Sequence, residues 1–270
     1  AVLPLYEIML VDVGTALLAI GPLLIVRIPQ PRREDLDRGD GRQPSIWTDM
    51  RAGLRYIRAW PGLMVLIGAA LIVKIALTPA FSLLPLLVSK HFGGDAAQLS
   101  LLEAVAGVGI VAGGLLLAAW GGFRRRIYTT MMGMVLLGLG FVSLGLTPGY
   151  LFWMALGSVL VVGLTIPLID GPIMAILQGT VVPEMQGRVF TIMGSLLGLT
   201  SPLGLAIAGP VSDWLGLQVW YLAAGVLCSL VGLSGFLIPA MVNIEENQNG
   251  AAVPGEGLAP ATTRVPTAGA

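Results

Sequence analysis

Long, uninterrupted runs of apolar residues dominate the hydrophobic pattern of this chain. Each run is about as long as the roughly 20 residues that a helix needs to cross a hydrocarbon core about 30 Å thick. The runs cover residues 5–26, 62–88, 99–120, 127–146, 151–177, 189–209 and 217–241. They do not alternate between polar and apolar residues, and they far exceed the ~10 residues of a barrel strand. The pattern predicts an all-α membrane protein with about seven transmembrane helices.

One polar segment between these runs is long, residues 27–60, and it begins with a proline- and charge-rich stretch. Such a stretch buries too little apolar area to fold alone, so we expect a linker. Behind it, Ser45 is placed to cap a short amphipathic helix. The apolar face of that helix would carry Ile46, Trp47, Met50, Leu54 and Ile57, with Arg51, Arg55 and Arg58 beside it. Two interpretations stay open: a helix on the anionic inner leaflet, or a linker helix packed under the bundle.

Composition and charge support the membrane interpretation. Hydrophobic residues make up 56% of the chain and charged residues 11%, against about 45–50% and about 25% in soluble domains. The basic residues stand between apolar runs, which argues for membrane topology and against nucleic-acid binding. With one cysteine, Cys228, and one histidine, His91, the chain has no internal disulfide and no cysteine- or histidine-rich metal site, and no cofactor is expected.

The basic residues also predict an orientation. One set of alternate loops carries most of the arginines, from residues 27–58, 124–126, 188 and 264, and the other set carries only Lys90. The positive-inside rule then places the linker and the C-terminus in the cytoplasm. The chain opens without an initiator methionine or a basic leader. It is therefore expected to start partway through a larger protein.

Three motifs carry a resemblance to a known family. They are SLLEAVAGVGIVAGGLLLAAWGGFRRR at 100–126, VVPEMQGRVF at 181–190 and GLAIAGPVSDWLG at 204–216. Together with the order of helix, long basic loop and six helices, they resemble a major facilitator superfamily transporter of the drug:proton antiporter branch, which includes macrolide and siderophore exporters. The resemblance covers about residues 1–241.

The resemblance implies a domain organisation. Residues 1–26 would be the last helix of the N-terminal half, 27–60 the cytoplasmic central linker, 61–241 the C-terminal six-helix bundle, and 242–270 a disordered cytoplasmic tail. If 61–149 and 150–241 are two inverted three-helix repeats, LLLAAWGGF and LAIAGPVSDWLG close equivalent helices.

The implied function is part of a secondary transporter that exports an amphipathic small molecule in exchange for protons by alternating access. Its partners would be membrane lipid, the substrate, protons, and either the missing N-terminal half or a second half-transporter. The alternative is a half-size membrane scaffold or accessory subunit that transports nothing itself. An enzyme is not expected, because there is no second histidine, no HExxH motif and no serine with a base in reach.

Several charged residues fall inside the predicted helices, and the candidates for function among them are Asp12, Lys74, Glu103 and Asp170. In hydrocarbon such residues cost at least ~2.5–3.5 kcal/mol, so they usually face a cavity or a partner. One hypothesis is that Lys74 and Glu103 form or exchange an ion pair that couples protons to transport; a static pair that fixes helix register is the alternative. Asp170 stands in IPLIDGPIM, where the prolines are expected to break the helix, either at a cavity or as a simple kink.

Arginines and glycines complete the candidates. By resemblance, Arg124, Arg125, Arg126 and Arg188 would join a cytoplasmic latch, or else anchor the topology; a tight loop is expected to present Arg188 just before a helix. Asp213 would close the outer side. Two glycine pairs in GxxxG spacing, Gly109 with Gly113 and Gly194 with Gly198, predict close approach between helix backbones.

Overall fold

The computed structural model describes residues 9–10, 13–18, 20 and 46–244. The chain divides into two compact units, 1–45 and 46–270. The described residues of the first unit are helical. Asp12 and most of the predicted first helix, 5–26, lie outside the described residues, as do the long polar stretch 27–45 and residues 245–270 of the predicted tail.

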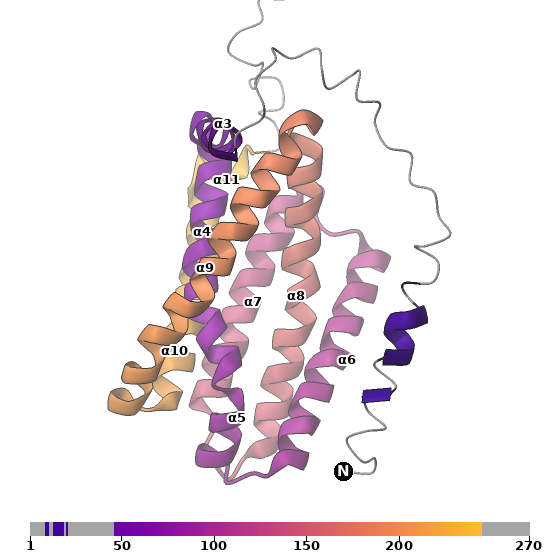
Figure 1. The fold of residues 1–270 in the computed structure, drawn as a ribbon. Coiled ribbons are helices and arrows are strands. Elements are labelled where there is room, and N and C mark those ends of the chain that lie inside the picture. Colours follow the sequence, from indigo (N-terminus) through magenta and orange to yellow (C-terminus); the bar gives the residue numbers. More distant parts are fainter. Residues whose placement is uncertain (1–8, 11–12, 19, 21–45, 245–270) are drawn as a thin grey trace, which may run out of the picture. The chain divides into compact units, whose positions relative to one another are not determined.

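The second unit is a bundle of helices, and its described part contains no strand (Figure 1). Six of the described helices are long and apolar enough to cross a membrane. In chain order the elements are α3 (Ile46–Ala59), α4 (Pro61–Ser82), α5 (Leu84–Leu86), the π-helical turn η1 (Leu87–His91), α6 (Ala96–Trp120), α7 (Arg126–Leu146), α8 (Phe152–Thr180), α9 (Pro183–Leu215), α10 (Leu217–Leu237) and α11 (Pro239–Val242). The all-α membrane fold is therefore confirmed.

Glycines set the closest helix contacts. α7 packs against α8 and α10, α6 packs against α8, and α4 packs against α9. At the α7–α10 contact, a Cβ on Gly225 would lie 2.6 Å from the carbonyl oxygen of Gly138. At the α6–α8 contact, a Cβ on Gly109 would lie 2.6 Å from the carbonyl oxygen of Leu160. Only glycine lets these backbones approach so closely.

Buried apolar side chains form two clusters along the bundle. One joins α4, η1, α6, α7, α8 and α10 towards the end where α5 lies. The other gathers Ile57, Trp60, Leu63, Ile127 and their neighbours towards the end where α3 lies. Ile244, 1% exposed, belongs to the second cluster. The packed bundle thus continues past residue 241, the boundary expected from the sequence.

The helix α9 starts earlier than the sequence predicted. PEMQGR was expected to be a tight loop, but α9 begins at Pro183, where the ring pre-sets the helical φ and the missing N–H costs nothing. The Gln186 side-chain amide donates to the carbonyls of Gln178 and Val181, 3.0 Å from each. The turn between α8 and α9 is consequently only two residues long, and Arg188 lies inside a helix.

The predicted break in IPLIDGPIM is absent, because α8 runs without interruption from Phe152 to Thr180 through Pro167 and Pro172. Prolines are tolerated in membrane helices where neighbouring helices hold the freed backbone groups. α8 packs along α6 and α7 here, and the Thr130 hydroxyl of α7 donates to the carbonyl of Ile169 between the two prolines, 3.5 Å away. Asp170 is thus carried by a continuous helix.

Candidate functional site

A cavity of about 390 Å³ opens between the helices at the level of Phe81, Glu103 and Tyr221. Its walls come from α4, α5, α6, α7, α8 and α10. The lining residues are Ala80, Phe81, Leu84, Glu103, Ala106, Gly107, Ile110, Phe141, Leu144, Val159, Val162, Gly163, Ile166 and Tyr221. Among the described residues that line it, Glu103 is the one carboxylate. The cavity therefore has the composition of a small-molecule site, mainly apolar with a few polar groups.

Three aromatic rings make one wall of this cavity. Phe81 meets Phe141 edge to face, with ring centroids 5.5 Å apart, and Phe141 stacks on Tyr221 at 6.2 Å. The Tyr221 hydroxyl donates to the carbonyl of Ala80 at 2.6 Å. Trp220 Nε1 donates to the carbonyl of Ala76 at 3.1 Å. These bonds fix α10 against α4 and hold the aromatic wall rigid.

Aromatic residues near the ends of these helices differ in burial. Such residues are typical of the membrane–water interface, yet Tyr221 and Trp60 are 0% and 6% exposed. Tyr150, Trp153 and Trp214, which lie near helix ends, are 83%, 80% and 90% exposed. Position near a helix end could not separate the two groups, because the difference lies in which neighbouring helix each ring meets.

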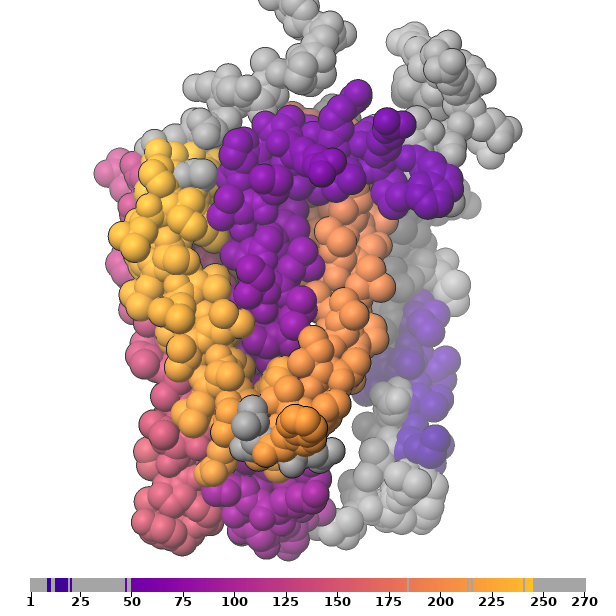
Figure 2. Space-filling view, turned by 90° about the vertical axis from the view of Figure 1, so that its left-hand side faces the viewer, coloured from indigo at the N-terminus to yellow at the C-terminus, as the bar shows by residue number. Residues whose placement is uncertain are grey.

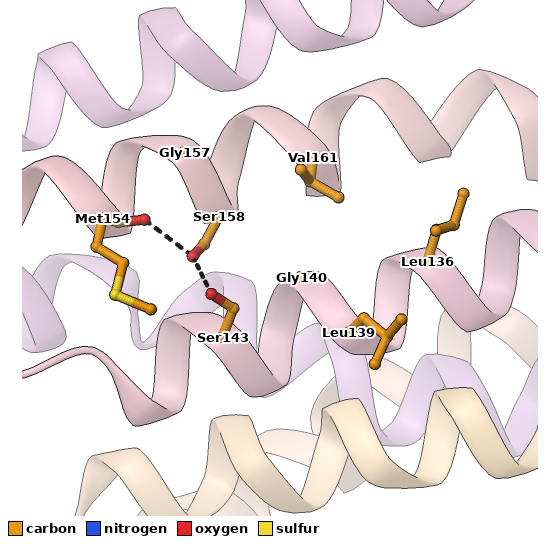
Figure 3. Close-up of a pocket in the computed structure, with 8 residues that line it drawn as sticks. All are labelled: Leu136, Leu139, Gly140, Ser143, Met154, Gly157, Ser158 and Val161. Atoms are coloured by element: carbon orange, nitrogen blue, oxygen red, sulfur yellow. Dashed lines mark hydrogen bonds between the residues drawn. The ribbon is translucent and has the colours of Figure 1, made fainter.

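A second hollow, also about 390 Å³, lies between α7 and α8 (Figure 3). It is lined by Leu136, Leu139, Gly140, Ser143, Met154, Gly157, Ser158 and Val161. The hydroxyls of Ser143 and Ser158 are 2.8 Å apart, and Ser158 Oγ lies 2.9 Å from the carbonyl of Met154. The two hydroxyl groups thus have hydrogen-bond partners within the protein. None of the described residues that line this hollow carries a charge.

The intramembrane charges are arranged differently from the pair that the sequence suggested. Lys74, Glu103 and Asp170 are all exposed on the described bundle. Within the described residues Lys74 forms no salt bridge with Glu103 or with Asp170, although Lys74 lies near enough to Asp170 for its charge to act there. At 1.5 Å per residue, Lys74 stands ~20 Å from the start of α4, and Asp170 ~15 Å from the end of α8 at the same side. Glu103 stands ~26 Å from the end of α6 on that side, so it lies further from that end of the bundle than Lys74 and Asp170 do.

The candidate latch residues cluster at the end of the bundle where α3 lies. Arg124 and Arg125 precede α7, and Arg126, its first residue, donates from Nη1 to the carbonyl of Ala175 on α8 at 3.3 Å. Arg188 lies in the second turn of α9, 3.7 Å from Met185 Sδ, and its backbone packs against α3. Asp213 lies in the last turn of α9, at the opposite end, and its side chain is not among those described. Their role as a latch stays a prediction.

His91 joins three elements at the end opposite α3, which the sequence did not reveal. Its Nε2 lies 2.9 Å from the carbonyl of Thr147 and 3.1 Å from Nε2 of Gln218. Its ring also meets Phe92 edge to face at 4.8 Å. His91 lies between the apolar runs 62–88 and 99–120, and it is the last residue of η1. The residues next to His91 in the sequence do not indicate these contacts, because both polar partners are distant in sequence.

The described part of the chain combines six helices of membrane length, glycines at the closest helix contacts and charged residues on those helices, which defines a polytopic α-helical membrane protein. Residues 65–265 match the family described as Major Facilitator Superfamily. The chain therefore belongs to the major facilitator superfamily.

Relatives within this family include named export proteins. Macrolide efflux protein A of Streptococcus pyogenes is 29% identical over 229 residues, 85% of this chain and 56% of the relative. The protein of the same name from Enterococcus faecalis is 30% identical over 201 residues, 74% of this chain and 61% of the relative. Multidrug efflux pump Tap of Mycolicibacterium fortuitum is 27% identical over 199 residues, 72% of this chain and 46% of the relative. The chain thus spans about half the length of these relatives, and no solved structure matches it.

Proposed function

We propose that this chain forms the C-terminal half of a secondary transporter that exports amphipathic small molecules across a bacterial cytoplasmic membrane. The observation that carries the proposal is the exposure of Lys74, Glu103 and Asp170 on helices of membrane length. An ionisable side chain turned to hydrocarbon costs several kcal/mol, about 2.5–3.5 on insertion scales. These residues therefore belong to a face that water or another membrane segment covers.

The remaining half of the transporter would supply that cover. Burial within the bundle is uneven: 61% of the most apolar stretch of α7 is buried, but only 17% of that of α6 and 22% of that of α9. α6 and α9 therefore leave the most surface for another segment. We assign 1–26 to the last helix of the N-terminal half, 27–60 to the cytoplasmic linker, 61–244 to the C-terminal bundle, since Ile244 belongs to its core, and 245–270 to a cytoplasmic tail.

The substrate class follows from the cavity around Glu103. Aromatic and aliphatic walls take up an apolar body by area burial, while one carboxylate attracts a cationic group. Macrolide and multidrug exporters are among the relatives. We infer an amphipathic substrate, and in particular one that carries an amine.

Proton coupling is the finer part of the proposal. A carboxylate that binds a proton when its surroundings become apolar, and releases it when they become wet, couples protons to conformational change. Glu103 takes this role, and the Lys74–Asp170 interaction changes as the two halves rock. Arg124, Arg125, Arg126 and Arg188 would close the cytoplasmic side, and Asp213 the outer side.

Thiol accessibility in native membranes tests whether the charged face is wet. In a Cys228→Ser background, cysteine replaces Lys74, Glu103 or Asp170 one at a time in the transporter that contains this chain. A membrane-impermeant maleimide should label these positions, and substrate should change the labelling rate. Leu139→Cys, exposed on α7, is the lipid-facing control and should stay unlabelled. If none of the four cysteines reacted with the maleimide, a water-filled transport pathway along this face would be rejected.

Transport assays separate the exporter from the scaffold alternative. Glu103→Gln is expected to abolish proton-driven uptake of a macrolide into everted vesicles, the direction that corresponds to export from the cell, while leaving the protein in the membrane. Efflux that persists unchanged in this variant would overturn the coupling role of Glu103. A transporter-sized complex with no efflux in the unmodified form would instead favour the scaffold.

A further inference from the structure

The helix α3 has a face that the bundle leaves uncovered. α3 lies across the ends of α4 and α9 (Figure 2). Its contact face is made by Gly53 and Ile57: a Cβ on Gly53 would lie 3.4 Å from Cβ of Arg188, and Ile57 is 5% exposed. The chain therefore holds α3 against the bundle by one side only.

Beside this contact face runs an exposed apolar stripe, defined by Trp47, Met50 and Leu54. These side chains are 75%, 44% and 44% exposed. At 100° per residue the stripe occupies the sector next to Gly53 and Ile57. Three large apolar side chains in line on a helix that already packs by another face mark an interaction surface.

A row of arginines borders the stripe on its other side. Arg51, Arg55 and Arg58 are exposed, and within the described part of the chain no side chain forms an ion pair or hydrogen bond with them. Around the helix the order is thus bundle contact, apolar stripe, basic row. A basic row directly above an apolar stripe is the pattern of a helix that lies in the plane of a membrane interface.

We propose that the stripe of α3 inserts into the membrane interface and that the arginine row binds anionic phospholipid headgroups. The position of α3 at the ends of membrane-spanning helices brings it to headgroup depth. Trp47 suits this depth because tryptophan prefers the interface. The guanidinium groups match phosphate oxygens in charge and in hydrogen-bond geometry. A protein partner would have to supply both an apolar groove and acidic groups at this depth, whereas an anionic bilayer supplies both everywhere.

The binding has a functional consequence, because α3 contacts α9 next to Arg188. Anchoring α3 to headgroups holds the cytoplasmic-end turns of α9 and α4 at a fixed depth in the membrane. The lipid composition of the membrane then influences the helix that carries Arg188. This inference does not depend on which small molecule is exported.

Depth-dependent fluorescence quenching tests the proposal on the whole chain. A bimane probe is attached at Leu54→Cys in the Cys228→Ser background, and the protein is placed in nanodiscs of phosphatidylcholine alone or with one third phosphatidylglycerol. Lipids that carry a doxyl group near the headgroup are expected to quench the probe, several-fold more strongly when phosphatidylglycerol is present. The matched control is the same probe at Ala59→Cys, exposed on the far side of the arginine row, where quenching should stay low in both membranes.

Charge variants complete the experiment. Combined Arg51→Gln, Arg55→Gln and Arg58→Gln should remove the effect of phosphatidylglycerol, since each basic residue near an anionic surface favours docking about five-fold. These side chains are exposed, so size-exclusion profiles should be unchanged. Equal quenching in both membranes, or a probe that stays in water in both, would overturn the proposal. Protection from water without quenching would also overturn it, because a protein segment would then cover the stripe.

Discussion

Two helices of this protein carry the same glycine spacing and use it differently. In α6, Gly109 and Gly113 face the backbone of α8, and a Cβ on Gly113 would overlap the carbonyl oxygen of Leu164. In α9, ideal Cβ atoms on Gly194 and Gly198 meet no heavy atom within 4 Å in the described structure. The first pair is part of the core, and the second is open surface. GxxxG spacing therefore permits close contact between two helix backbones, but it does not determine whether such a contact forms within this chain.

The largest effect is expected at the buried glycine pair. Gly113→Leu forces α6 away from α8 and should lower the free energy of unfolding by about 3 kcal/mol or more, because backbone cannot move aside as a side chain can. Gly114→Leu is the matched control, since a Cβ at Gly114 meets open space. The thermal unfolding midpoint in detergent measures both variants. Similar midpoints for the two would contradict the assigned α6–α8 contact.

A side-chain contact between helices should rank second. Tyr221→Phe removes the hydroxyl that bonds the Ala80 carbonyl and leaves a buried acceptor unpaired, at a cost of about 1–3 kcal/mol. Tyr150→Phe, at a ring that is 83% exposed, should leave the midpoint unchanged. If Tyr221→Phe were also neutral, α10 would be held to α4 by apolar packing alone.

The start of α6 gives a smaller and purely local effect. The Asp95 carboxylate accepts a hydrogen bond from the backbone N–H of Gln98 at 3.0 Å and caps the helix. Asp95→Ala should cost about 1 kcal/mol, whereas Asp95→Asn keeps a capping oxygen and should stay near the unmodified protein. Loss of stability in both variants would assign Asp95 a role in charge rather than in capping.

The smallest effect on stability is expected at the open glycine pair. Gly194→Leu and Gly198→Leu should change the free energy of unfolding of this chain by no more than about 0.5 kcal/mol, as at other open surface positions. In the assembled transporter the same variants should reduce efflux, because we expect the other half to approach α9 there. Normal efflux would mean that this face of α9 stays uncovered.

The lengths of the apolar runs predicted most helices of the bundle. They gave wrong limits where a helix continues into polar residues, and the prolines wrongly predicted a break in α8. The limits of α7 were predicted to within one residue, since a polar loop stands at each end. α9 is longer than its predicted run by six residues at each end, because Pro183 starts it and its terminal turns are polar. α8 continues through its two prolines where it packs against α6 and α7. Neither outcome could be read from local propensity.

For the charged residues, too, the sequence predicted which helix carries each one but not which other residue each one meets. Run length alone placed Lys74, Glu103 and Asp170 inside helices, where their energetic cost marks them for function. Which of them meet depends on how far along each helix they stand and which way each helix faces. The sequence suggested Lys74 with Glu103; the fold brings the charge of Lys74 to bear on Asp170 and leaves Glu103 in an aromatic cavity.

By itself the sequence determined that this protein lies in a membrane, that it is helical and which family it resembles, because apolar run length and short motifs are local properties. Only the tertiary structure decided which glycine pair packs, which aromatic rings are buried, and which side of α3 the bundle leaves exposed. Those outcomes depend on contacts between residues far apart in the chain, and the helical period alone does not specify which neighbour each face will meet.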